Sequence, residues 1–186
     1  MANPLEKPAS YEDLLAVPDH LVAEILNGTL HTHPRPRFRH ARAATSLGTS
    51  LTPPFDWGKD GPGGWWILIE PEIHLTDHII VPDLAGWRRE NVPKLPDVAW
   101  TDIPPDWVCE VLSPSTARLD RTIKRDIYAT HKVSFIWLVE PENRTVECFE
   151  LKGKNWQLTG TFADDDTINA PPFAAVPFSL SPLWID

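Results

Sequence analysis

The chain has 186 residues, of which 42% are hydrophobic and 23% are charged, and this composition excludes fibrous and largely disordered proteins. We expect one domain over residues 1–186, because two ordinary domains need a longer chain. The net charge of −9 argues against a nonspecific nucleic-acid coat protein, since phosphate affinity comes from lysine and arginine. It does not exclude an enzyme with a locally basic cleft.

Cysteine use and hydropathy limit the cellular setting. The two cysteines, Cys109 and Cys148, lie in apolar, strand-like runs and form neither a disulfide framework nor a zinc knuckle. Residues 1–12 lack the apolar stretch of a signal peptide, and no run reaches the roughly 18 apolar residues of a membrane helix. We therefore expect a cytoplasmic protein without a membrane partner. The 20 prolines predict short elements joined by stiff loops.

The first half of the chain is predicted to alternate short helices and strands. A capped helix begins at Ser10, the pair Asn27-Gly28 predicts a hairpin between two strands, and Arg39–Leu51 has helical periodicity. Residues 53–64 form a loop rich in proline and glycine. Further strands are predicted over Gly64–Glu70, Glu72–Leu75 and Ile79–Trp87.

The second half predicts a strand, a helix and a strand in succession. Trp107–Leu112 is a nearly continuous apolar strand, Arg118–Lys132 has an apolar stripe at helical spacing, and Phe135–Val139 is a buried strand. This order is a βαβ crossover and implies a parallel pair of strands. A meander and a proline-rich C-terminal segment that packs back over the domain follow. The fold class is therefore α/β, or α+β, with a mixed central β-sheet flanked by helices and an additional β-meander.

Two carboxylates stand in apolar surroundings. Asp83 follows the apolar run Ile79–Pro82, and Glu110 lies in the middle of Trp107–Leu112. A buried ionised carboxylate is costly unless it is paired or bound to a metal. One such acid is usually structural, but two on neighbouring strands repel each other and favour a shared cation. If the strands are adjacent, oxygen ligands of this kind suit Mg²⁺ or Mn²⁺.

A lysine on the following helix is the candidate third group. Lys124 lies beside the apolar stripe and leans toward the sheet, where a cation would orient water and stabilise charge on phosphate oxygens. The alternative is a solvated pair with Asp120 one turn earlier, and spacing alone favours it. Basic segments at 35–42 and 118–132 fit a substrate with a phosphate backbone, and on the second of these Arg121 is a candidate substrate-binding residue. Runs of charged residues of this kind are, however, more often only the solvent-exposed face of an element.

Several blocks then match a known family. They are Val22–Gly28, His40 opening a helix, Val81–Ala85, Pro105–Thr116, Asp120, Lys124, Tyr128-Ala129 and Phe135–Pro141. Over roughly Tyr11 to Trp184 the sequence resembles the Uma-type family of restriction endonucleases, and the block from Glu110 to Thr116 is the most specific. The resemblance implies a restriction-endonuclease-like fold of the PD-(D/E)XK nuclease superfamily and a metal-dependent phosphodiesterase site.

The resemblance also implies roles for individual residues. Asp83 takes the place of the motif aspartate, Glu110 that of the second acid, and the backbone carbonyl of Val111 that of a further metal ligand. Leu112 stands where the superfamily has lysine, which in this family appears on the next helix, at the position of Lys124.

Other positions keep two interpretations. Glu24 matches a family glutamate that would be an outer catalytic acid, or it is a strand-edge residue beside the hairpin. His40 contacts phosphate or caps its helix. His31 and His33 share a strand face, but an exposed hairpin explains them better than a zinc site. Most tryptophans are expected in the core, whereas Trp87 and Trp100 are expected at a rim or interface.

The leading hypothesis is a Mg²⁺- or Mn²⁺-dependent endonuclease that hydrolyses DNA. Cleavage of both strands needs two sites, so a homodimer is expected, with the apolar C-terminal segment as a possible interface. The second hypothesis is a catalytically inactive nuclease-fold module that binds nucleic acid or a protein partner. The net negative charge and the leucine at position 112, where the superfamily motif has lysine, favour it somewhat. The third is purely structural, with Glu110 a hydrogen-bonded buried acid and Lys124 a surface lysine.

Overall fold

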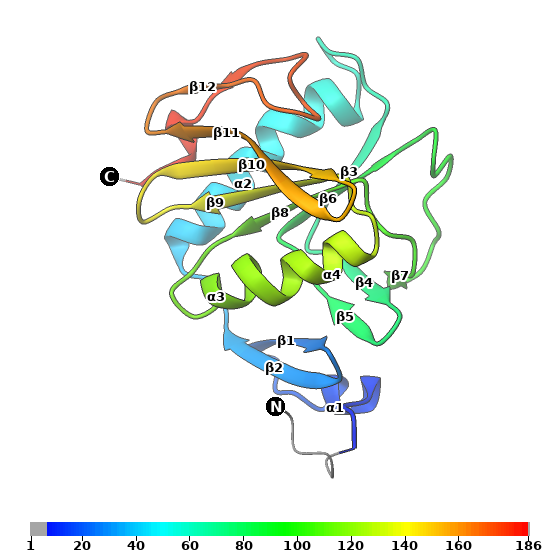
Figure 1. The fold of residues 1–186 in the computed structure, drawn as a ribbon. Helices are drawn as coiled ribbons and strands as arrows, with labels where there is room; N and C mark the ends of the chain where they lie inside the picture. Colours follow the sequence, from blue (N-terminus) through cyan, green and yellow to red (C-terminus); the bar gives the residue numbers. More distant parts are fainter. Residues whose placement is uncertain (1–6, 186) are drawn as a thin grey trace.

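The computed structural model describes residues 7–185, which form two main β-sheets with helices packed against them (Figure 1). The larger sheet has six strands in the order β11-β10-β9-β8-β6-β3. Its strands are β3 (Trp65–Ile69), β6 (Leu84–Arg88), β8 (Trp107–Val111), β9 (Phe135–Glu140), β10 (Thr145–Lys152) and β11 (Asn155–Ala163). Strands β8 and β9 are parallel and the other pairs are antiparallel. The predicted mixed sheet, βαβ crossover and meander are thus confirmed.

The second sheet has the strand order β2-β1-β5-β4-β7. Its strands are β1 (Leu21–Leu26), β2 (Thr29–Pro34), β4 (Glu72–Leu75), β5 (His78–Ile80) and β7 (Trp100–Thr101). The predicted hairpin joins β1 and β2. Asn27 and Gly28 have φ angles of 52° and 71°, a left-handed conformation that this pair adopts readily in a two-residue turn. A small third sheet pairs β12 (Thr167–Ile168) with β13 (Phe178–Ser179).

Helices cover both faces of the six-stranded sheet (Figure 1). They are α2 (Phe38–Leu51) on one face and α3 (Ala117–Leu119) and α4 (Arg125–Thr130) on the other, with the π-helical turns η1 (Thr52–Asp56) and η2 (Asp120–Lys124) and the 3₁₀ turn η3 (Ser181–Leu183). Helix α1 (Tyr11–Leu15) lies beside β1 of the second sheet. The α1 cap is the one expected, because the Ser10 hydroxyl accepts from the Asp13 N–H and the Asp13 carboxylate accepts from the Ser10 N–H.

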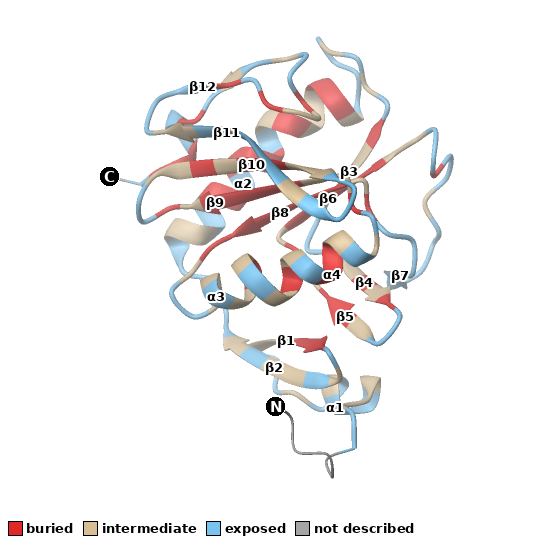
Figure 2. Ribbon diagram, viewed as in Figure 1, coloured by how far each residue is buried: buried red, intermediate tan, exposed pale blue. Residues whose placement is uncertain are grey.

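Strand β8 divides the core into two clusters (Figure 2). Its alternate residues Trp107 and Cys109 pack toward α2, whereas Val108 packs on the other face, in the cluster that includes Ile127 and Tyr128 of α4. Glu110 belongs to the second face by the same alternation. Apolar residues of the C-terminal segment, among them Phe173 and Leu183, complete the first cluster, which confirms that this segment packs back. These side chains are therefore not available as a dimer interface.

Some predicted elements differ in the structure. The single strand expected over Ile79–Trp87 is wrong: β5 and β6 belong to different sheets, and the chain passes from one to the other at residues 81–83. Pro82 has no N–H to donate to a sheet, and the N–H of Val81 donates to the Glu24 carboxylate instead. Asp83 therefore lies at a junction between the two sheets.

Three smaller corrections concern local geometry. The loop predicted from residue 53 begins as η1, and the second long helix is interrupted by η2 and ends at Thr130. Trp87 is not a rim residue: it is 1% exposed, and its indole N–H donates to the carbonyl of Ile103. Trp100 is 42% exposed, in agreement with its predicted position at a rim. Within residues 7–185, no helix has both the length and the apolar character to span a membrane.

Candidate active site

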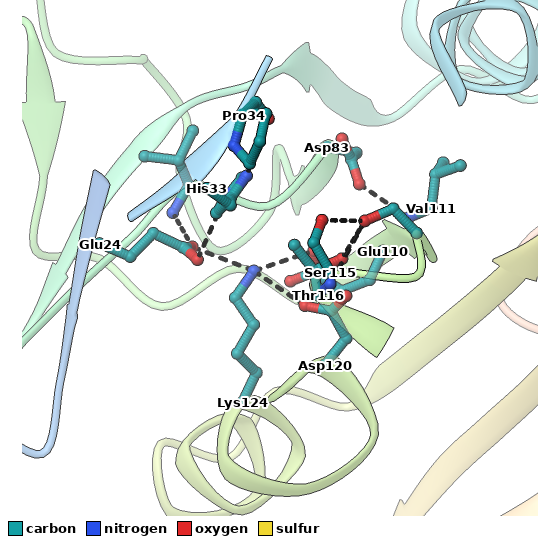
Figure 3. Close-up of polar contacts among 12 residues, drawn as sticks. Glu24, His33, Pro34, Asp83, Glu110, Val111, Ser115, Thr116, Asp120 and Lys124 are labelled. Carbon is teal, nitrogen blue, oxygen red and sulfur yellow. Dashed lines mark hydrogen bonds and ion pairs between the residues drawn. The ribbon is translucent and has the colours of Figure 1, made fainter. Parts of the chain in front are cut away.

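A cleft of about 550 Å³ opens where the two sheets meet. Its walls come from the β1–β2 hairpin, the start of α2, the end of β8 and the segment that leads into η2. The titratable side chains that line its inner part are His33, His40, Asp83, Glu110, Asp120 and Lys124. Glu24 is buried directly behind this lining, at the ammonium group of Lys124 (Figure 3).

Asp83 and Glu110 come from paired strands. Strands β6 and β8 are antiparallel, with Leu84 opposite Cys109, so the next position of this register places Asp83 across from Glu110. An Asp83 oxygen, Oδ2, accepts a 2.7 Å hydrogen bond from the N–H of Val111. The adjacency on which a shared cation depends is therefore present, and it follows directly from the sheet order.

Lys124 lies at the centre of a buried charge cluster (Figure 3). Its Nζ is 3.0 Å from Oε1 of Glu24, 3.1 Å from Oε2 of Glu110 and 3.3 Å from Oδ1 of Asp120. The Lys124–Asp120 pair expected from helical spacing does form, but it is buried rather than solvated. The surface lysine of the structural hypothesis is thus wrong, because Lys124 is only 4% exposed, whereas its buried, hydrogen-bonded Glu110 is confirmed.

Asp120 and Lys124 lie four residues apart in the π-helical turn η2, and both face inward, as residues at this spacing do on one side of a helix. A π-turn accommodates an extra residue and rotates the following side chains relative to an α-helix, and such turns are frequent at functional sites. In η2 the first and last residues, Asp120 and Lys124, are buried, whereas Arg121 is partly exposed. Helical periodicity predicts that Asp120 and Lys124 share a face, but not that this face is buried.

Hydrogen bonds and charges set the protonation of the cluster. Burial raises the pKa of Glu110 well above its usual value, although Lys124 opposes the shift. Burial alone would lower the pKa of Lys124, but the charges of Glu110, Glu24 and Asp120 together raise it well above the ordinary value. The other oxygen of Glu110 accepts from the hydroxyl of Tyr128 at 2.5 Å. Lys124 is therefore a permanently charged donor at neutral pH.

His40 holds the opposite side of Asp83. Its Nε2 is 3.2 Å from Oδ1 of Asp83, and this carboxylate raises the pKa of His40 although burial opposes the shift. His40 does not cap its helix, since Arg37 is the N-cap residue of α2. The Nδ1 atom of His40 is buried without a hydrogen-bond partner in the described part of the chain. The imidazole thus interacts with the site through Nε2.

Most of the chain matches the model of a protein family. The model of the Uma2 family, described as a putative restriction endonuclease, matches residues 8–182. The chain belongs to this family. It is also similar in structure to a putative nuclease belonging to DUF820 from Anabaena variabilis, with a TM-score of 0.75 and 21% sequence identity over 95% of this chain and 97% of that one. No curated protein sequence gives a significant match.

Glu24 of the Uma2 chain is buried. Glu24 is 2% exposed and accepts from the N–H of Val81 at 2.9 Å, so it is not the solvated strand-edge residue of the alternative interpretation. Its second oxygen lies 4.0 Å from Nε2 of His33. We had not expected His33 at the cleft. Strand alternation contains the signal, because Glu24 pairs with His31, and His33 lies two positions farther along the same face.

Arg121 does not reach the cleft of the Uma2 chain. Its guanidinium pairs with Glu147 at 2.5 Å and with Glu140 at 3.2 Å, on the neighbouring strands β10 and β9. The expected substrate contact from this residue is therefore not supported by its position. The cleft instead receives its exposed cations from the segment before and at the start of α2, namely Arg35, Arg37 and Arg39.

The donor set suits a hard divalent cation. Within residues 7–185 no group of three or more His, Cys, Asp or Glu side chains is arranged to hold a metal ion. Mg²⁺, however, is usually held by one or two carboxylates and keeps several waters. Asp83, Glu110 and Val111 all line the cleft, and the two carboxylates with the Val111 carbonyl supply such oxygen donors. The residues present therefore fit this class of metal.

Proposed function

We propose that this Uma2 chain is a metal-dependent endonuclease of the PD-(D/E)XK type that hydrolyses phosphodiester bonds in DNA. The observation that carries the proposal is the pairing of Asp83 and Glu110 on adjacent strands beside a buried lysine at the cleft. An acid pair with a cation is what phosphodiester hydrolysis requires, because negative charge develops on the phosphate oxygens.

The metal would be held by Asp83, Glu110 and the carbonyl of Val111. When bound, Mg²⁺ or Mn²⁺ supplies Lewis acidity and lowers the pKa of a coordinated water. Formally, Glu24, Glu110 and Asp120 surround the single ammonium of Lys124, which leaves two negative charges uncompensated when all three acids are ionised. A divalent cation beside them removes this imbalance, whereas otherwise a proton must do so.

Lys124 would act as a charged hydrogen-bond donor and not as a general base. The neighbouring acids hold its pKa high, so it keeps its proton at neutral pH. It would orient the attacking water and stabilise charge on the phosphate oxygens. Glu24 and Tyr128 are positioning residues, because Glu24 binds the Lys124 ammonium and Tyr128 fixes the carboxylate of Glu110. His40 positions Asp83 in the same way and is also near enough to the cleft to contact phosphate.

A cleavage assay tests the proposal. Supercoiled plasmid and circular single-stranded DNA are incubated with Mg²⁺ or Mn²⁺ and wild type, Glu110→Gln or the control Glu150→Gln. Glu150 lies on β10, outside the cleft, and pairs with Lys152. We expect Glu110→Gln to lose about 10²- to 10⁴-fold in rate and the control to keep it. Equal cleavage by Glu110→Gln and wild type refutes the site. DNA binding by a wild type that cuts neither substrate with either metal supports the inactive nuclease-fold module instead.

We also propose that the enzyme acts as a homodimer, in which each of the two sites takes and cuts one strand of DNA. Phe173, Leu180 and Leu183 of the C-terminal segment do not provide its interface, because they are buried in the core of the same chain. Sedimentation velocity over a range of protein concentrations tests the dimer. A monomer that persists at every concentration, with and without DNA, refutes it.

A further inference from the structure

We infer that the cleft takes a single strand of DNA, with one base stacked on Phe38 and adjacent phosphates bound by Arg37 and Arg39. The inference rests on the proposed endonuclease function and specifies its substrate class. It places Phe38 among the residues that determine specificity, although this side chain contributes nothing to the charge cluster around Lys124.

Phe38 is an aromatic side chain presented to solvent at the edge of the cleft. It is the first residue of α2 and is 89% exposed, the largest exposure among the large hydrophobic side chains recorded for residues 7–185. Residues on both sides of it line the cleft, including Arg37 and Arg39. A solitary exposed apolar residue needs no explanation in general. An exposed ring between two cleft-lining arginines, however, has the composition of a base-stacking site.

The exposed positive charge of the cleft lies along one segment. Arg35, Arg37 and Arg39 come from the same five residues, and the remaining lysine, Lys124, is buried among carboxylates. The other outer lining residues, which include residues 112–116 and 141–142, contain neither lysine nor arginine and include the acids Glu70, Glu72 and Glu142. A duplex presents two phosphate backbones, and a single row of arginines can follow only one of them. One row of arginines with an aromatic ring suits one strand.

The arginines are arranged so that phosphate can compete for them. Arg39 pairs with Glu142 at 3.4 Å, but both side chains are well exposed, and such pairs contribute little to stability. Arg35 is anchored to the carbonyl of Asp19 by hydrogen bonds of 2.8 and 3.2 Å, which holds the segment leading into α2 in place. The N-cap residue Arg37 gives no side-chain hydrogen bond to the first turn. The N–H groups of that turn therefore add to the attraction for phosphate.

Fluorescence anisotropy with labelled oligonucleotides tests the inference. A single strand of about 12 nucleotides and the duplex of the same sequence are titrated in EDTA, so that no cleavage occurs. We expect the single strand to bind more tightly than the duplex. Phe38→Ala should weaken single-strand binding about 5- to 150-fold, as expected for the loss of one stacked base, and Phe38→Trp should retain it.

Trp57 supplies the matched control. It is 71% exposed and does not line the cleft, so Trp57→Ala removes an exposed aromatic ring of similar kind without touching the binding surface. We expect its affinity for the single strand to equal that of wild type. An oligonucleotide containing 2-aminopurine distinguishes stacking from an indirect effect, because its fluorescence is quenched when the base stacks. Quenching should occur with wild type and be lost in Phe38→Ala.

The outcomes separate this inference from the proposed function. Tighter binding of the duplex, or unchanged single-strand binding and quenching in Phe38→Ala, overturns the substrate class even if the protein cleaves plasmid. Single-strand binding that depends on Phe38, in a protein that cleaves no DNA with either metal, supports the substrate class and refutes the endonuclease. Loss of affinity in both Phe38→Ala and Trp57→Ala also overturns the inference, because it assigns no special position to Phe38.

Discussion

Removal of the Lys124 ammonium is the strongest perturbation that the buried cluster offers. The substitution Lys124→Met keeps the length and most of the volume of the side chain but leaves Glu24, Glu110 and Asp120 without their shared cation. Removing one partner of a buried ion pair typically costs 3–5 kcal/mol, because the remaining charge is buried and uncompensated. We therefore expect a loss of about 3–5 kcal/mol in the free energy of unfolding near neutral pH, a large part of the 5–15 kcal/mol of an ordinary domain.

The loss should depend on pH in a defined direction. In wild type the pKa of Lys124 is raised, so its contribution is complete below the ordinary lysine value and is lost only as the pH rises through the higher folded value. In the variant, burial raises the pKa of Glu110 without an opposing ammonium. The folded state then holds protons that the unfolded state releases above the ordinary carboxyl value. The variant should therefore lose stability, relative to wild type, as the pH rises from about 5 to about 8.

Urea unfolding at these two pH values measures the effect. The control is Lys152→Met, because Lys152 pairs with Glu150 on the surface and its side chain is 57% exposed, so a loss of no more than about 1 kcal/mol is expected. A similar small, pH-independent loss in Lys124→Met would refute the reasoning, since it would mean that the cluster is hydrated and its charges are screened. Partial rescue of the variant by Mg²⁺ would agree with a cation taking over the neutralisation.

Four further predictions concern the same site and the domain. Tyr128→Phe removes the hydroxyl that donates to Glu110; we expect unfolding free energy to fall by about 1.5–3 kcal/mol in urea titrations and cleavage to slow. His40 has a raised pKa, so its stabilising contribution is complete below about pH 6.5 and is lost as the pH rises through the folded value; His40→Gln should remove this dependence from a series of urea midpoints. Mn²⁺ should raise the melting temperature of wild type but not of Asp83→Asn, as read by thermal shift. The expected single domain should unfold in one calorimetric transition; two separated transitions would contradict it.

The strands that carry the acids were accessible from the sequence because their signal is local. Glu110 interrupts an apolar run, and Asp83 follows one, and both patterns predict strands with a costly charge in the interior. The pairing of β6 with β8 places the two positions opposite each other. The break between β5 and β6 was missed, because Ile79 and Ala85 continue the same alternation across Pro82 although the two halves join different sheets.

Local sequence patterns do not predict the contacts of the charge cluster around Lys124, because these contacts join residues far apart in the chain. Glu24 and Lys124 are one hundred positions apart, and their contact depends on how the hairpin packs against η2. The same limit explains Arg121, which shares its basic helix with Lys124 but is drawn outward by Glu140 and Glu147. The local density of charged residues therefore predicts that the segment is basic, but not which of its side chains enters the cleft.

The position of the lysine also has a physical reason in the packing of β8. Leu112, at the position where the resemblance to PD-(D/E)XK nucleases implies a lysine, is 3% exposed and packs in the cluster that contains Val108 and Leu138. A lysine there would bring a charge into an apolar interior at the cost of core packing. The π-helical turn places Lys124 over the same carboxylates from the opposite side, where Glu24 and Asp120 can share its charge. Strand β8 can thus remain apolar beyond Glu110, because Lys124 supplies the cation from the helix. The spacing along the strand alone suggests that the lysine is missing, although Lys124 lies beside the Glu110 carboxylate.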